Sequence, residues 1–115
     1  MPDRAFAVLA ALFGLVAVAA GAFAAHGIGD APTAGLVETA SRYQMWHALA
    51  MLALAVSPVR ARAALTALAL GVLLFSGSLY GLAIGAPRSV AWMTPVGGTL
   101  LIAGWALAAM AFWRR

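Results

Sequence analysis

The stretch Ala5–Ala25, which reads AFAVLAALFGLVAVAAGAFAA, decides the fold class of this chain. It is 21 residues long and uncharged. As an α-helix it would extend about 30 Å, the thickness of the hydrocarbon core of a bilayer. A secretory signal peptide is the alternative, because Arg4 gives a basic start and the small residues after Val18 could form a cleavage site. The run is longer than the apolar core of a usual signal peptide, so we expect it to remain as a membrane-spanning helix.

The composition of the whole chain favours the same fold class. Of the 115 residues, 65% are hydrophobic and 9% are charged, a balance far from that of soluble domains. A water-soluble fold of this size exposes much of its surface and needs polar residues to cover it. The sequence does not supply them. We therefore predict an all-α membrane protein with a single domain over residues 1–115, and the lipid bilayer as its first partner.

Further apolar runs predict three more helices, at about 34–57, 63–85 and 90–113. Segments rich in Pro, Gly or charge separate the helices, at residues 30–33, 58–62 and 86–89. Short connections of this kind join helices that run in opposite directions. With the helix at about 5–25, the sequence predicts a four-transmembrane-helix bundle built from antiparallel hairpins.

The distribution of arginine predicts the orientation of the bundle. An even number of spans places both termini and the middle loop on one side, which would hold five arginines: Arg4, Arg60, Arg62, Arg114 and Arg115. The other side would hold two, Arg42 and Arg88. Because cytoplasmic loops carry the excess of positive charge, we expect both termini to be cytoplasmic.

The net charge of +4 does not indicate nucleic-acid binding. The arginines stand singly or in pairs beside apolar runs, and they form no basic stripe with interleaved aromatic residues. Cysteine is absent, which excludes disulfides, thiolate metal sites and cysteine nucleophiles. We expect no nucleic-acid partner.

Small residues predict where the helices approach one another, because helices in lipid associate through close backbone contact. Gly77, Gly81 and Gly85 form a ridge with a spacing of four. The other expected packing positions are Gly14, Gly21, Gly97, Gly98 and Gly104. We interpret these glycines as contacts within one bundle. A face for a homo-oligomer or a larger membrane complex is the alternative.

Polar residues at membrane depth are costly, so each is a functional candidate. The candidate polar site comprises His26, Glu38, Arg42, Tyr43, Gln44, His47, Ser76, Ser78 and Tyr80. For Glu38 and Arg42, four residues apart, the simpler interpretation is an interfacial ion pair. For Gln44 and His47 it is hydrogen bonding between helices. The alternative is a polar site near the outer surface with His26 and His47 as its titratable members.

Catalytic and metal sites are not indicated by these residues. His26 and His47 lack the spacing of zinc ligands, and the acids near them are few. Ser76 and Ser78 lie within a predicted helix, where hydroxyl groups commonly bond to a preceding carbonyl oxygen. We expect no catalytic residue, no metal and no cofactor.

Several motifs in order resemble one known family. They are GAFAAHG at 21–27, YQMWHA at 43–48, FSGSLY at 75–80, TPVGG at 94–98 and Gly104-Trp105. Together they resemble the domain-of-unknown-function family 423, the YgdD-like small inner-membrane proteins, over nearly the whole chain. Ala24 departs from the glycine expected there. The resemblance implies a four-span plasma-membrane protein and no activity, with His26, the 43–47 cluster and the 76–80 segment as shared polar features.

Of three functions that the sequence leaves open, it favours the first, a structural or accessory subunit without catalytic activity that docks through its glycine faces, because the chain is small. The second is an oligomeric transport or channel component, in which His26, Glu38, Arg42 and His47 would line a vestibule. The third is binding of a lipid or quinone in a groove lined by His26, Trp46, His47 and Tyr80.

Overall fold

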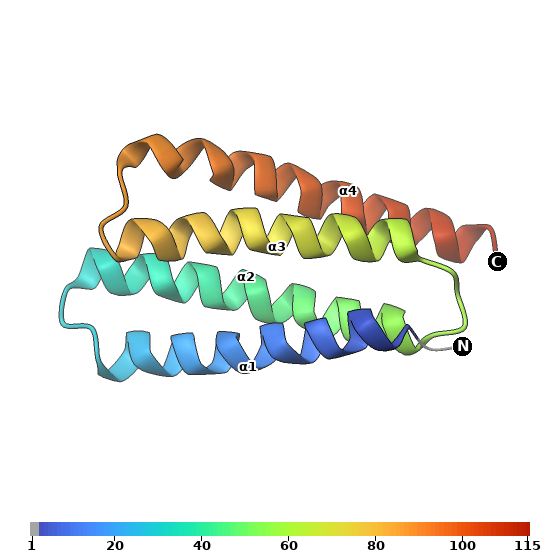
Figure 1. The fold of residues 1–115 in the computed structure, drawn as a ribbon, viewed down its shortest axis with the longest axis horizontal. Coiled ribbons are helices and arrows are strands. Elements are labelled where there is room, and N and C mark those ends of the chain that lie inside the picture. The colour runs from blue at the N-terminus through green and yellow to red at the C-terminus, as the bar shows by residue number, and fades with distance from the viewer. Residues whose placement is uncertain (1–2) are drawn as a thin grey trace.

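The computed structural model describes residues 3–115 and consists of helices joined by short loops (Figure 1). The α-helices are α1 (Arg4–His26), α2 (Ala31–Val56), α3 (Arg62–Ala83) and α4 (Met93–Trp113), and a 3-10 helix, η1 (Arg88–Trp92), precedes α4. Successive α-helices run antiparallel, and both ends of the chain lie at the same end of the bundle together with the α2–α3 loop. We call this the terminal end.

The predicted helix bounds agree with the structure except at α2 and α4. α2 begins at Ala31, three residues earlier than expected, because Asp30 is its N-cap and accepts a hydrogen bond from the Thr33 amide at 2.9 Å. Pro32 fits there because the first turn of a helix needs no amide hydrogen. The segment expected to be a turn is therefore the first turn of α2. In α4, the expected first residues belong to η1 instead.

Each α-helix packs mainly against the α-helix that precedes or follows it in the sequence. α1 packs on α2, α2 packs between α1 and α3, and α3 packs on α4. The core includes Met51 of α2 and Leu68 of α3, both fully buried. Small residues surround them, among them Ala10, Ala48, Ala64 and Ala69. Small side chains let helix backbones approach closely, as expected where lipid removes the hydrophobic force between helices.

Glycines allow α3 and α4 to approach closely. A Cβ atom built on Gly97 would lie 2.3 Å from the backbone nitrogen of Phe75, and one built on Gly104 would lie 2.5 Å from Leu68 Cδ2. From the α3 side, a Cβ on Gly71 would lie 3.0 Å from the Gly97 carbonyl oxygen. These three glycines form the α3–α4 seam. Gly71 was not among the expected packing positions.

The predicted ridge of Gly77, Gly81 and Gly85 is not a seam of this bundle. A Cβ on Gly77 or Gly85 would meet nothing within 4 Å, and Gly81 approaches only Ala86 of the following turn. Gly77 lies on a face of α3 that no other helix covers. Gly85 instead ends the helix, since its φ of 98° is a conformation that favours glycine. Gly14 and Gly98 make ordinary contacts with Met45 and Phe75, and Gly21 faces Ser41 closely.

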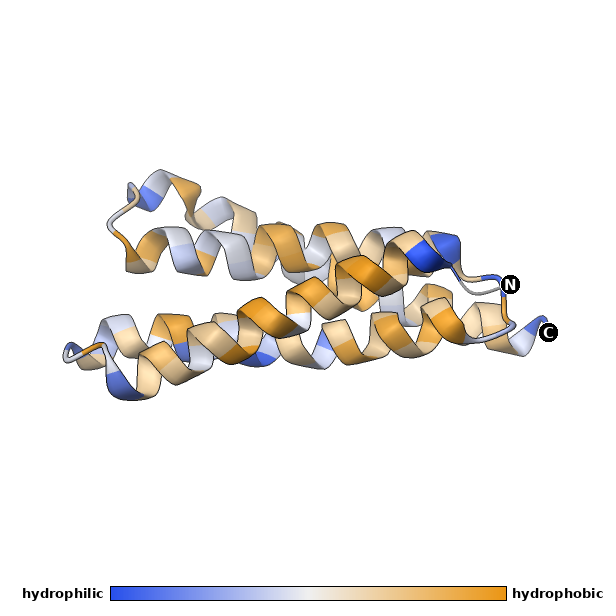
Figure 2. Cartoon of the chain, turned by 60° about the horizontal axis from the view of Figure 1, so that its bottom comes forward, coloured by the Kyte–Doolittle hydropathy of each residue, from blue (hydrophilic) through white to orange (hydrophobic). Residues whose placement is uncertain are grey.

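Hydrophobic residues make up most of the length of the helices (Figure 2). Large side chains face outward, including Leu15, Leu73 and Ile102, which are 65%, 56% and 73% exposed. By length and composition, three helical segments can cross a membrane: α1, α3 and the segment 88–113. α2 is the most polar helix and lies between α1 and α3. The fold is a membrane helical bundle. That α2 also crosses the membrane remains a prediction.

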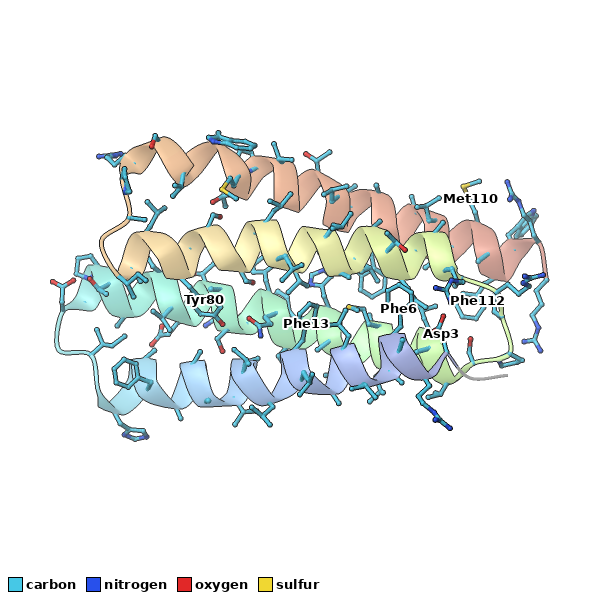
Figure 3. The ribbon with its side chains drawn as sticks, in the orientation of Figure 1. Asp3, Phe6, Phe13, Tyr80, Met110 and Phe112 are labelled. Carbon is cyan, nitrogen blue, oxygen red and sulfur yellow. The ribbon has the colours of Figure 1, made fainter. Side chains whose placement is uncertain are left out.

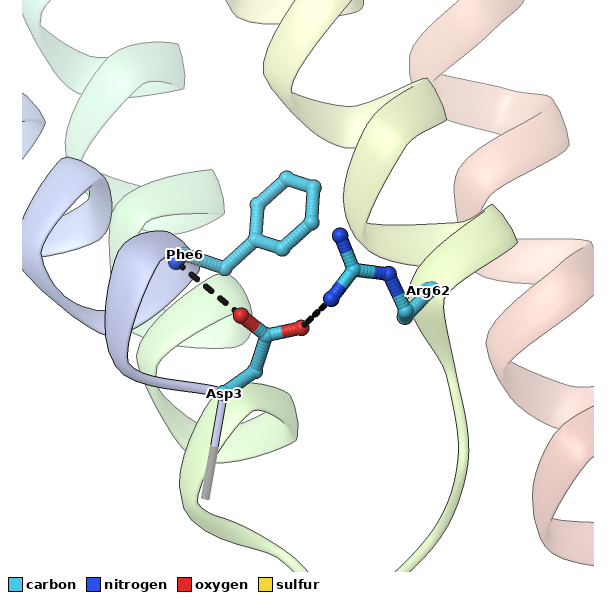
Figure 4. Close-up of polar contacts among 3 residues, drawn as sticks. All are labelled: Asp3, Phe6 and Arg62. Carbon is cyan, nitrogen blue, oxygen red and sulfur yellow. Dashed lines mark hydrogen bonds and ion pairs between the residues drawn. The ribbon is translucent and has the colours of Figure 1, made fainter. Parts of the chain in front are cut away.

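An ion pair closes the terminal end (Figure 4). The Asp3 carboxylate caps α1 by accepting from the Phe6 amide, and it binds Arg62 Nη1 at 2.7 Å. The Asp3 amide donates to the Ala55 carbonyl oxygen at 2.7 Å. The guanidinium of Arg62 also lies over the Phe6 ring, 5.3 Å from its centroid. The start of α1 is thereby joined to the end of α2 and the start of α3.

Candidate functional site

Gln44 is the centre of a buried polar network that joins three helices. Its side chain is on α2 and is only 4% exposed. Its amide nitrogen donates to the Phe13 carbonyl oxygen of α1 at 2.8 Å. Its amide oxygen accepts from the hydroxyl of Tyr80 at 2.9 Å, and Tyr80 extends from α3 toward α2 (Figure 3). One side chain therefore holds α1, α2 and α3 in register.

Serine hydroxyls make similar connections on either side of Gln44. Ser41 of α2 donates to the Ala17 carbonyl oxygen of α1 at 2.8 Å, and Ser76 of α3 donates to the Ala40 carbonyl oxygen of α2 at 2.7 Å. Ser78 lies 2.5 Å from the Thr94 hydroxyl at the start of α4. Ser41 was missed in the sequence, although it precedes Gln44 by three residues and so shares its helix face.

These contacts satisfy the buried polar groups of the bundle. In the part of the chain from residue 3 onward, no buried side-chain nitrogen or oxygen lacks a hydrogen-bond partner. Gln44, Ser76, Ser78 and Tyr80 therefore use their polar atoms in packing the helices. They form structural links, and they leave no free polar atom in the interior of the bundle for a ligand.

His47 differs from Gln44, three residues earlier on the same helix. It is 5% exposed, and its Nδ1 lies 2.6 Å from the carbonyl oxygen of Tyr43 on its own helix. It does not hydrogen-bond to another helix, which was the simpler interpretation from the sequence. The Nε2 atom has no partner within residues 3–115, and because no buried atom is left unpaired, Nε2 reaches the surface of a groove.

This groove lies between α2, α3 and α4 and has a volume of about 550 Å³. We call it the His47 groove. Its lining is apolar and aromatic apart from His47, and comprises Tyr43, His47, Phe75, Pro95, Gly98, Leu101, Ile102 and Trp105. Gly98 leaves space in the wall, since a Cβ there would only just contact the Phe75 ring, at 3.7 Å.

The aromatic side chains of the groove contact one another. Tyr43 and Phe75 have ring centroids 4.6 Å apart, and Tyr43 stacks nearly parallel to His47 at 6.2 Å. Trp105 meets the His47 ring edge-on at 5.9 Å. These contacts hold the His47 ring from two sides. The groove thus combines two polar side chains, His47 and Tyr43, with apolar and aromatic walls.

Three residues of the expected polar site lie elsewhere. His26, Glu38 and Arg42 are exposed. His26 is 13 residues beyond Phe13 on α1, about 20 Å along the helix from the level of Gln44, so the two histidines do not form one site. Glu38 and Arg42 do not pair: the sole ion pair among residues 3–115 joins Asp3 and Arg62. No group of three or more metal-binding side chains occurs within the same residues.

The model of the family described as "Protein of unknown function (DUF423)" matches residues 20–98, which is more than half of the chain. This chain belongs to the DUF423 family. The matched range contains Gln44, Tyr80 and most of the His47 groove, and it ends before Trp105.

Relatives of this DUF423 protein are membrane proteins of similar length. A UPF0382 membrane protein of Haemophilus influenzae is 45% identical over 87% of this chain and 86% of its own. The UPF0382 inner membrane protein YgdD of Escherichia coli K12 is 44% identical, over 93% and 88%. A UPF0382 membrane protein of Staphylococcus saprophyticus is 38% identical, over 89% and 91%. No solved structure matches. With its apolar helices, this DUF423 chain is a multi-pass protein of the bacterial inner membrane.

Proposed function

We propose that this protein binds a membrane-dissolved amphipathic molecule in the His47 groove and acts without catalysis. The observation that carries the proposal is the state of His47, a largely buried residue that lines an apolar and aromatic groove and whose Nε2 has no hydrogen-bond partner among residues 3–115. At membrane depth, a polar atom that opens on such a groove is costly unless something pairs with it. A convergent polar group in a largely apolar groove is the usual form of a small-molecule site.

The position of the groove favours a ligand that arrives through the lipid. His47 lies 16 residues after the start of α2, about 24 Å along that helix, which is well within the apolar length of the bundle. Ile102 and Trp105, two residues of the groove wall, are 73% and 51% exposed on the outer surface. The opening therefore faces the acyl chains, and a hydrophobic molecule can enter from the side.

The groove is lined by one histidine and one tyrosine among apolar walls, with no acid to form a catalytic pair with either, which suits binding better than chemistry. A transport role has less support, because the exposed His26, Glu38 and Arg42 do not join the buried polar residues in a path across the bundle. An accessory role in a larger complex is compatible with ligand binding. It would use the ligand-bound groove or the open face at Gly77 as a contact, and it remains a prediction from the sequence.

A fluorescence titration tests the proposal. Trp46, Trp92 and Trp113 are changed to Phe, which leaves Trp105 of the groove as the sole tryptophan of the four. The protein is placed in lipid nanodiscs and titrated with a dibrominated alkylphenol, whose bromine atoms quench tryptophan on contact. We expect quenching that saturates. Linear quenching, as for a probe that is merely dissolved in the lipid, would contradict the proposal.

Two leucine substitutions form the matched control. In Gly98→Leu the new side chain occupies the groove, and we expect the saturable part of the quenching to disappear. In Gly77→Leu the new side chain meets open space on another face of α3, and we expect the titration to be unchanged. Equal titrations of the two variants would show that the probe binds outside the groove.

A further inference from the structure

We infer that the ligand of the His47 groove is a hydroxylated aromatic ring, of the hydroquinone or phenol class, that donates a hydrogen bond to Nε2 of His47. The inference rests on the proposed function, since it names the chemistry of the ligand that the groove would take. It follows from which of the two ring nitrogens carries the proton and from the residues that surround the ring.

The hydrogen bond to Tyr43 determines the tautomer of His47. The partner of Nδ1 is a backbone carbonyl oxygen, which can only accept, at 2.6 Å. Nδ1 must therefore carry the proton and donate it. In a neutral imidazole the other nitrogen then has a lone pair and accepts. A charged imidazolium is strongly disfavoured at this depth, with no acid in the groove lining. Nε2 therefore offers an acceptor, and the matching ligand group is a donor.

The walls of the groove favour an aromatic ring as the bearer of that donor. Tyr43, Phe75 and Trp105 provide three aromatic surfaces around His47, and aromatic rings pack favourably against one another at such sites. A volume of about 550 Å³ exceeds that of one ring. The remaining space, open toward Ile102, would take the first part of an alkyl chain whose end lies in the lipid.

The test compares a ligand that can donate with one that cannot. Dodecylhydroquinone carries two hydroxyl groups, and its dimethyl ether has the same ring and chain with both hydroxyl groups methylated. Each is titrated, under reducing conditions, into nanodisc-bound protein that already holds the dibrominated alkylphenol, and the recovery of Trp105 fluorescence measures its binding by displacement. A single hydrogen bond corresponds to roughly tenfold in affinity. We expect the hydroquinone to bind about tenfold more tightly than the ether.

A conservative variant assigns the difference to Nε2. In His47→Asn, the side-chain amide can still donate to the Tyr43 carbonyl oxygen from near the place of Nδ1, but nothing replaces Nε2. We expect the dissociation constant of the hydroquinone to rise about tenfold, to the value for the ether, and that of the ether to stay constant. Helix content measured by circular dichroism shows whether the variant is folded.

A measurement on the unaltered side chain does not depend on that variant. Nitrogen-15 chemical shifts distinguish protonated from unprotonated imidazole nitrogens, and the chain has two histidines. His26→Gln therefore leaves one set of signals, from His47. We expect Nδ1 to be protonated and Nε2 not, and we expect the hydroquinone but not the ether to shift the Nε2 signal.

The outcomes separate the inference from the proposed function. Saturable binding of both ligands with equal affinity, or an Nε2 that carries the proton, would overturn the inference and leave the groove as a binding site. An absence of saturable binding for both ligands would overturn the proposed function, and the inference would fall with it.

Discussion

Gln44 and His47 are three residues apart on α2, but their surroundings give them different roles. Gln44 faces α1 and α3 and uses both ends of its amide in bonds between helices. His47 faces α3 and α4, bonds to its own helix, and keeps one nitrogen free at the groove. Their positions on one helix were visible in the sequence. The partners were not, because they depend on which faces of the other helices turn toward α2.

A double-mutant cycle measures the contact between Gln44 and Tyr80. We expect Tyr80→Phe to lower the free energy of unfolding in detergent by about 1 kcal/mol, the usual value for a hydrogen bond between membrane helices. Gln44→Ala should cost more, because it also removes the bond to Phe13 and leaves a cavity. The double variant should be less destabilised than the sum of the two, by about 1 kcal/mol. Strict additivity would show that the two side chains do not interact.

Asp30 makes the start of α2 sensitive to acid. The side-chain hydrogen bond from Thr33, followed by the Thr33 amide, lowers the pKa of Asp30 from its ordinary value of 3.8. Because the pKa is lower in the folded state, the cap is fully stabilising above about pH 3.8 and is lost as the pH falls through the folded pKa. We expect the protection of the Thr33 amide from exchange, relative to its intrinsic rate at each pH, to fall in that range. Asp30→Ala should show low protection at every pH, and a protection that does not change with pH in the unaltered chain would contradict the cap.

At the scale of the elements, the sequence predicted the helices well and their contacts less well. Uncharged runs of the right length, and the segments rich in Pro, Gly or charge between them, indicated where the helices lie. The seam was harder to predict because small residues occur on several faces of α3. Gly77 and Gly81 gave the more regular spacing, whereas Gly71 is the one that faces α4. The two faces of α3 can be told apart only in the folded structure, where α4 packs on the face that carries Gly71.

An alanine substitution in the α3–α4 seam and one on the uncovered face of α3 should affect the free energy of unfolding differently. In Gly97→Ala the Cβ would overlap backbone atoms of Phe75, which cannot move aside as a side chain can. We expect α3 and α4 to separate and the free energy of unfolding to fall by about 1–3 kcal/mol. Gly77→Ala has open space, and we expect no loss of stability, since alanine favours a helix over glycine. Thermal unfolding in detergent measures both, and equal losses would contradict the seam.

At the scale of the whole molecule, the prediction of an apolar four-helix bundle followed from composition and run length alone. The candidate polar site was predicted in part. Its buried members were identified because polar residues are rare in these runs, but His26, Glu38 and Arg42 were grouped with them by position along the chain. Glu38 and Arg42 lie on α2, whose polar residues occur all round the helix, so its sequence does not reveal which of them face outward. His26 is the last residue of α1 and is exposed there.

The predicted membrane topology can be tested by locating the termini and two of the loops. With four crossings, reporters fused at each terminus and a cysteine label placed in the loop 57–61 should all be on the cytoplasmic side. A label in the loop 27–30 should be on the opposite side. α2 is the uncertain crossing by composition, since it is not among the segments apolar enough to span. Termini on opposite sides of the membrane would show that α2 does not cross.

The contact between Asp3 and Arg62 has a consequence for how the protein is made. The two residues are 59 positions apart, so the acid leaves the ribosome well before its partner is synthesised. Until Arg62 follows, the carboxylate at the start of α1 can cap its own helix but has no arginine to bind. The bond that joins α1 to the start of α3 can therefore form only in the second half of synthesis, after Arg62 has left the ribosome.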